Sequence, residues 1–117
     1  MRVLVPETEL RSMLRSRRRL ADRWPTSIDD VQLLLATMQV PDFTLHDVLE
    51  TGFVTIESEL VPHGLLGLRH RRALGLVDAL NRDGARVASP KQHPRQVAAV
   101  TVHDVVVDGV PAVRRSA

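Results

Sequence analysis

The chain of 117 residues contains no cysteine and no tyrosine, and Trp24, Phe43 and Phe53 are its only aromatic residues. Without cysteine it forms no disulfide, no thiolate nucleophile and no zinc–thiolate site. So few rings provide no stacking platform of the kind that binds single-stranded DNA or RNA. Duplex DNA stays open as a partner, because a duplex is bound through phosphates and groove edges, which need arginine and polar groups.

Long apolar runs are also missing from the sequence. The longest are a few residues, far too short to span a membrane, and the opening residues lack the apolar core of a signal peptide. We therefore expect a cytoplasmic protein without a membrane partner. The length suits one domain, residues 1–117, with a core that needs neither disulfides nor a metal.

Spacings typical of catalytic or metal sites are not found. There is no His-Glu-x-x-His, no acidic calcium loop and no glycine run that would cradle phosphate. His46 and Glu50 lie four residues apart and could share a metal on a helix, but a solvated pair is the more ordinary interpretation. We expect a protein that is not an enzyme and that uses no cofactor or metal.

Charge is distributed in blocks rather than evenly. Lys91 is the only lysine among sixteen basic residues, and the formal net charge is +2, so the sequence pI of about 10.3 overstates the basicity. The sums are +4 for residues 1–24, −7 for residues 25–68 and +5 for residues 69–117. Two interpretations remain: separate faces for two partners, or an acidic middle that docks on the basic end of another copy, which favours a homo-oligomer.

The first half of the chain predicts mainly helices. Residues 1–5 alternate like a short strand, and residues 7–24 carry apolar positions at helical spacing with arginines on the opposite face. Ser27, with Asp30 three residues on, predicts the start of a second helix. Thr44 and Asp47 repeat this pattern for a short helix that ends at Gly52.

The second half predicts one long helix followed by strands. Residues 69–83 place Ala73, Leu76, Val77 and Leu80 on one helical face, and Gly84 is a suitable stop. Short strands are expected over residues 53–61, 86–88 and 97–107. Asp108-Gly109 is a strong hairpin signal, and residues 114–117 are expected to fray. The fold class is therefore α+β: three to four helices with a C-terminal antiparallel hairpin or small sheet.

The run from Leu76 to Asp104 resembles the recognition-helix end and β-wing of a winged helix-turn-helix, particularly of MarR-like regulators. Residues 43–52 are similar to the helix that precedes the recognition helix in such folds. The resemblance covers about half of the chain and implies a transcription regulator that binds duplex DNA as a homodimer. The residues that it implies as DNA contacts are Arg69, Arg71, Arg72, Lys91, His93 and Arg95. We expect Arg82, on the same predicted helix as the first three, to contact the groove with them.

Two functions therefore remain in view. The first is a non-catalytic, duplex-DNA-binding regulator of winged-helix type. The alternative is a protein–protein adaptor or assembly protein, for example a phage-like or host-factor-binding module, whose acidic residues 25–68 dock on a basic partner.

Overall fold

A computed structural model describes residues 1–59 and 61–113. It contains four α-helices, one 3-10 helix and a six-stranded mixed sheet, so the predicted α+β class is confirmed. In chain order the elements are β1 (Arg2–Leu4), α1 (Thr8–Leu14), α2 (Arg17–Arg23), α3 (Ile28–Met38), α4 (Leu45–Glu50), β2 (Thr55–Glu57), β3 (Leu66–His70), β4 (Ala73–Leu80), the 3-10 helix η1 (Pro94–Gln96), β5 (Ala99–Val107) and β6 (Val110–Pro111).

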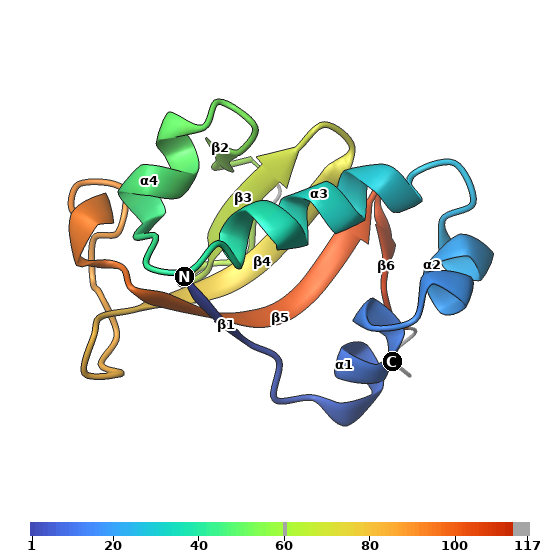
Figure 1. The fold of residues 1–117 in the computed structure, drawn as a ribbon, viewed down its shortest axis with the longest axis horizontal. Coiled ribbons are helices and arrows are strands. Elements are labelled where there is room, and N and C mark those ends of the chain that lie inside the picture. Colours follow the sequence, from blue (N-terminus) through green and yellow to red (C-terminus); the bar gives the residue numbers. More distant parts are fainter. Residues whose placement is uncertain (60, 114–117) are drawn as a thin grey trace.

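The strands follow the order β1-β5-β4-β3-β2, and β6 also pairs with β5. All neighbouring pairs are antiparallel except β1 and β5, which run parallel. Helix α3 lies across one face of the sheet, with α4 and η1 side by side at one end and α1 and α2 at the other (Figure 1). The core forms where Val31, Leu34 and Met38 of α3 are fully buried against this face.

The long helix predicted over residues 69–83 is wrong, because these residues belong to the β3–β4 hairpin. The two-residue turn is Arg71-Arg72, in which Arg71 adopts a positive φ of 52°. A turn of this kind usually contains Gly, Asn or Asp, so the sequence carried no turn signal. Strand β4 is buried along most of both faces, and its apolar run therefore lacks the alternation that distinguishes a strand from a helix.

Gly67 in β3 shows how tightly this part of the sheet is packed. A Cβ atom added there would lie 2.6 Å from the Glu57 backbone oxygen and 2.7 Å from a Val61 methyl carbon. Both distances are shorter than van der Waals contact, so only glycine allows β2 and the following segment to approach β3.

Near the N-terminus, the helix predicted over residues 7–24 is divided into α1 and α2. The break occurs because the Ser16 side chain accepts a hydrogen bond from the Arg19 backbone N–H at 3.3 Å and so caps a new helix. Helix α3 is confirmed with Ser27 as its N-cap residue, as predicted, but the Ser27 side chain makes no capping hydrogen bond. Asp29 and Asp30 in its first turn instead complement the helix dipole.

Helix α4 follows its sequence signal closely. The Asp47 carboxylate accepts from the Thr44 backbone N–H at 2.9 Å, and the Thr44 hydroxyl in turn accepts from the Asp47 N–H, forming a reciprocal capping box. The backbone hydrogen bond from Thr44 is the main reason that the pKa of Asp47 lies below its ordinary value. Gly52 ends the helix with a φ of 78°, as predicted.

The β5–β6 hairpin predicted from Asp108-Gly109 is also confirmed. Both turn residues have positive φ, 51° and 80°, which a type I′ turn requires. The strand expected at residues 86–88 is reduced to a single bridge between Leu80 and Arg86. The fraying expected for residues 114–117 falls outside the described residues.

Candidate functional site

The segment between β4 and β5, residues 81–98, is much longer than the fold requires. We call these eighteen residues the β4–β5 connection. Antiparallel neighbours need only a short turn, and β3 and β4 are joined by the two residues Arg71-Arg72. Long surface loops in compact domains usually carry function, because they cost conformational entropy without contributing much to the core.

The β4–β5 connection is nevertheless fixed to the fold at several points. The Asn81 side-chain oxygen accepts from the backbone N–H groups of Asp83 and Ala85, both at 2.9 Å, and shapes the turn that leaves β4. Val87 donates its N–H to the Ala79 carbonyl at 2.9 Å. Val97 is fully buried and its carbonyl accepts from the Leu45 N–H of α4 at 3.0 Å. The segment therefore has a defined conformation.

Its charge is strongly one-sided. The connection contains four basic residues and one acidic residue, and all five are exposed: Arg82, Arg86, Lys91, Arg95 and Asp83. Lys91 contacts the Ser58 hydroxyl, and the Arg95 guanidinium lies 3.5 Å from the His46 Nε2 atom. Neither partner is a carboxylate. Arg95 also contributes to the lowered pKa of the nearby Asp47.

Arg2, near the start of the chain, lies next to the β4–β5 connection. The Arg2 backbone N–H donates to the Ala98 carbonyl at 3.3 Å. Arg2 and Arg82 line one surface hollow together with Met1, Asp42 and Phe43. Arg82 and Arg95 line the adjacent hollow. Within residues 1–59 and 61–113, neither Arg2 nor Arg82 forms an ion pair or a side-chain hydrogen bond. Arg2, Arg82 and Arg95 therefore form a row of exposed cations.

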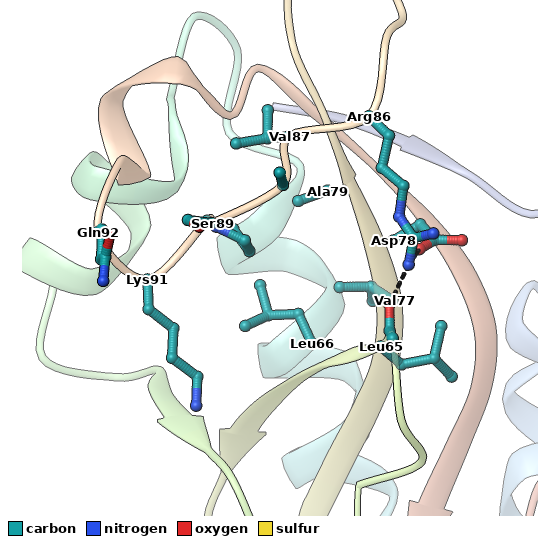
Figure 2. A pocket seen from close by; sticks show the side chains of 13 residues that line it. Leu65, Leu66, Val77, Asp78, Ala79, Arg86, Val87, Ser89, Lys91 and Gln92 are labelled. Carbon is teal, nitrogen blue, oxygen red and sulfur yellow. Dashed lines mark hydrogen bonds and ion pairs between the residues drawn. The ribbon is translucent and has the colours of Figure 1, made fainter.

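Beneath the β4–β5 connection lies a groove of about 520 Å³, which we call the β4-edge groove (Figure 2). It opens where β4 changes neighbours: Val77 pairs with Leu66 of β3, while Ala79 pairs with Val87 of the connection. Its floor is apolar and its rim carries charged side chains. The main lining residues are Leu65, Leu66, Val77, Ala79, Val87, Asp78, Arg86, Ser89, Lys91 and Gln92.

Asp78 holds one side of the groove together. Its Oδ2 lies 2.8 Å from the His103 Nε2 atom, and its Oδ1 lies 3.0 Å from the Arg86 guanidinium as an ion pair outside hydrogen-bond geometry. Arg86 also donates to the Gly64 carbonyl and so spans from the connection to the segment before β3. Asp78 therefore partly neutralises Arg86, whereas Lys91 on the opposite side has no carboxylate partner among the described residues.

The predicted DNA-contact residues are divided between the two ends of β4, which at eight residues spans about 26 Å. Arg69 is ion-paired with Glu57 at 3.0 Å, and Arg72 is ion-paired with Asp108. Arg71 and Arg72 lie in the β3–β4 turn. At the other end lie Arg82, Lys91, His93 and Arg95, all in the connection. The expected single helical surface over residues 69–83 is therefore wrong.

Three residues at the surface formed by the β4–β5 connection were not predicted from the sequence. They are Arg2, Arg86 and His46, the last as a contact of Arg95. Arg2 approaches the connection only because β1 pairs in parallel with β5, a long-range contact that local sequence patterns do not encode. The basic content of residues 81–98 was visible in the sequence and could have identified Arg86.

Three acidic residues of the middle block contact other groups of the same chain. Asp29 at the start of α3 pairs with Arg17 at 3.6 Å, Glu57 of β2 pairs with Arg69, and Asp47 caps α4. The pKa of Glu57 is lowered by the Glu59 backbone hydrogen bond first and by Arg69 second. Two of the seven acidic residues of the middle block are thus ion-paired with arginines of the other two blocks.

No metal cluster is found in the part of the chain that the structure describes: no three His, Asp or Glu side chains lie close enough to hold an ion. His46 and Glu50 are 3.9 Å apart on α4. Among the described residues, none forms a helix long and apolar enough to cross a membrane. No protein-family model matches the chain, and comparisons with curated proteins and with solved structures find no match.

Proposed function

We propose that this protein is a non-catalytic duplex-DNA-binding regulator that contacts phosphates through the β4–β5 connection. The observation that carries the proposal is the row of exposed arginines at Arg2, Arg82 and Arg95, brought together from two distant parts of the chain. The predicted contacts Lys91 and His93 lie on the same connection. The proposed DNA-binding surface does not include Arg69, Arg71 and Arg72.

The chemistry of the row supports a phosphate partner. An arginine without a carboxylate partner keeps its full charge and its planar fork of donors, which matches a phosphate. Neutral acceptors such as the Ser58 hydroxyl compete weakly with a phosphate for Lys91. The connection is also anchored by Val87 and Val97, so less conformational entropy is lost when its cations bind.

A duplex is favoured over a single strand because the β4–β5 connection contains no Phe, Tyr or Trp, and Phe43, which lines the hollow beside Arg2 and Arg82, is a single half-buried ring. Trp24 is buried, with its indole N–H donating to the Val110 carbonyl at 3.0 Å. Phe53, in the segment that leads into β2, is exposed but packs edge-on against His70 of β3. Without an aromatic platform on the connection, binding depends on phosphate contacts, which release counterions and weaken with salt.

The test is fluorescence anisotropy of a labelled random duplex and of one of its single strands, at low and at physiological salt. We expect the duplex to bind more tightly than the single strand, with an affinity that falls steeply as salt rises. No duplex binding at low salt would overturn the proposal. If salt-sensitive self-association appeared in its place, the adaptor alternative would gain, although the paired carboxylates Asp29 and Glu57 leave it less support.

A further inference from the structure

We propose that the β4-edge groove is a binding site for a small amphiphilic monocarboxylate, an apolar body with one anionic head. The groove has a volume of about 520 Å³, within the usual range for small-ligand sites. Figure 2 shows apolar side chains beneath the connection, with Lys91 and Arg86 on opposite sides of them. One apolar compartment with a few polar groups at its rim is the common composition of a small-ligand site.

The apolar body would lie above the nearly buried floor of Leu66, Val77 and Ala79 and would contact the more exposed apolar lining residues, which are Leu65, Ala88 and Pro90. The floor residues belong to the sheet, and Val77 is fully buried in the core, so the floor is held in place by the packing of α3 on β4. Val87 closes the upper side from the connection. A rigid floor allows an apolar ligand to bind without the cost of ordering the site.

The head is assigned to Lys91. Its ammonium group now contacts the neutral Ser58 hydroxyl, and a carboxylate is a stronger acceptor for an ammonium than a hydroxyl is. Arg86 on the other side donates to the Gly64 carbonyl, also a neutral acceptor. Lys91 can therefore exchange a neutral partner for a charged one when the ligand enters, whereas Arg86 already lies 3.0 Å from the Asp78 carboxylate.

Asp78 sets the limit on the charge of the head. Its carboxylate lies at the rim beside Arg86 and offsets one of the two positive charges. Lys91, Arg86 and Asp78 together give the rim a net charge of +1, which matches a head with one negative charge better than a dianionic phosphate. Asp78 would likewise attract a cationic head, which makes the cationic analogue of the ligand a stringent control.

The site has a regulatory consequence, and this consequence rests on the proposed function. Lys91 belongs to the β4–β5 connection, so a carboxylate bound to it removes one positive charge from the DNA-facing segment. A duplex would then bind less tightly in the presence of the ligand, because fewer counterions are released from its phosphates. Ligand binding itself does not depend on whether the protein binds DNA.

The test uses octanoate, with octanol and octyltrimethylammonium as neutral and cationic analogues. Binding is measured by calorimetry, and its place is mapped by amide chemical-shift changes in the ¹⁵N-labelled protein. We expect octanoate to bind most tightly and to shift the amides of Leu66, Val77 and Ala79. Lys91→Gln should weaken octanoate binding by about tenfold, since it removes a charge-assisted hydrogen bond. Arg71→Gln, at the far end of β4, should leave it unchanged.

Three results would overturn the site: no octanoate binding at millimolar concentration, equal binding of the cationic analogue, or equal affinity of Lys91→Gln and the unmodified protein. Duplex affinity is then measured with and without octanoate. If octanoate binds in the groove but no duplex binds under either condition, the proposed function fails and the ligand site stands. If the duplex binds and octanoate leaves its affinity unchanged, the regulatory consequence is wrong.

Discussion

The turn between β3 and β4 and the connection between β4 and β5 both join antiparallel neighbours and both carry arginines, but they differ in length and in bonding. The turn has two residues and the connection has eighteen. Arg72 of the turn is ion-paired with Asp108, and the Arg71 carbonyl accepts from Arg69. Arg82 of the connection has no such partner among the described residues. The Arg72 side chain is therefore engaged in the turn, whereas the Arg82 side chain remains available on the connection.

The difference shows that an arginine is better assigned to a function by its partners than by its place in a sequence pattern. Arg69, Arg71 and Arg72 form the densest basic run of the second half of the chain, yet two of them are ion-paired across the sheet. The cations of the connection are more widely spaced. Arg86 is ion-paired with Asp78, whereas Lys91 contacts the Ser58 hydroxyl and Arg82 has no side-chain partner among the described residues. A set of substitutions can test each side of this comparison.

The largest effect is expected for Gly67→Ala, on the hairpin side. The new Cβ would meet the Glu57 backbone oxygen at 2.6 Å, so β2 must shift, and we expect a loss of about 3 kcal/mol in the free energy of unfolding. Gly75→Ala is the matched control, since its Cβ would lie 3.6 Å from Leu34, an ordinary contact. Urea unfolding of both variants measures the difference. Equal losses would contradict the close approach at Gly67.

A smaller loss is expected for Thr44→Ala, which removes the cap of α4 beneath the connection. Loss of an N-cap hydroxyl should cost about 1 kcal/mol in the free energy of unfolding. Thr26→Ala, at an exposed position before α3, should change it little. Thermal unfolding followed by circular dichroism compares the two, and an unchanged melting temperature for Thr44→Ala would show that the capping box contributes nothing.

The same capping box predicts that the free energy of unfolding depends on pH. Because folding lowers the pKa of Asp47, its contribution to stability is fully present above the ordinary carboxyl pKa and is lost as pH falls through the lower, folded value. Asp47→Asn should therefore be less stable than the unmodified protein at neutral pH, and the two should converge in acid below about pH 4. Urea unfolding across this range measures the gap in stability. A gap that widened in acid would contradict the predicted sign.

The smallest effect is expected for Arg71→Gly in the turn, and it is a gain. Arg71 has a φ of 52°, a strained conformation for a side chain with a Cβ, and glycine relieves that strain while losing more backbone entropy on folding. The net stabilisation should be about 0.5 kcal/mol. Arg72→Gly, which gives up the ion pair with Asp108, should not stabilise. Urea unfolding of the two variants distinguishes them, and a lower stability for Arg71→Gly would contradict the strain.

How far the sequence could predict the fold depended on whether the signal was local. Thr44 with Asp47, and Asp108 with Gly109, act within a few residues and were interpreted correctly. The β3–β4 hairpin could not be found this way, because its turn has no glycine or asparagine and β4 is buried on both faces. Its strands are specified by pairing with β2 and β5, which is not a local property.

The candidate site was predicted in part for the same reason. Lys91, His93 and Arg95 were placed in a loop, and they do lie on the β4–β5 connection. Arg82 was placed on a helix with Arg69 and Arg71, and the structure separates it from both by the length of β4. Arg2 could not be predicted, since only the parallel pairing of β1 with β5 brings it to Ala98.

The role of the β4–β5 connection in DNA binding is best tested by the salt dependence of duplex affinity for two double variants. We predict that Arg82→Ala with Arg95→Ala flattens the slope of log affinity against log salt by about two units, because two phosphates are no longer neutralised. Arg71→Ala with Arg72→Ala, at the opposite end of β4, should leave the slope unchanged. A slope that is flattened by the turn variant and not by the connection variant would contradict the assignment of the β4–β5 connection as the DNA-binding segment.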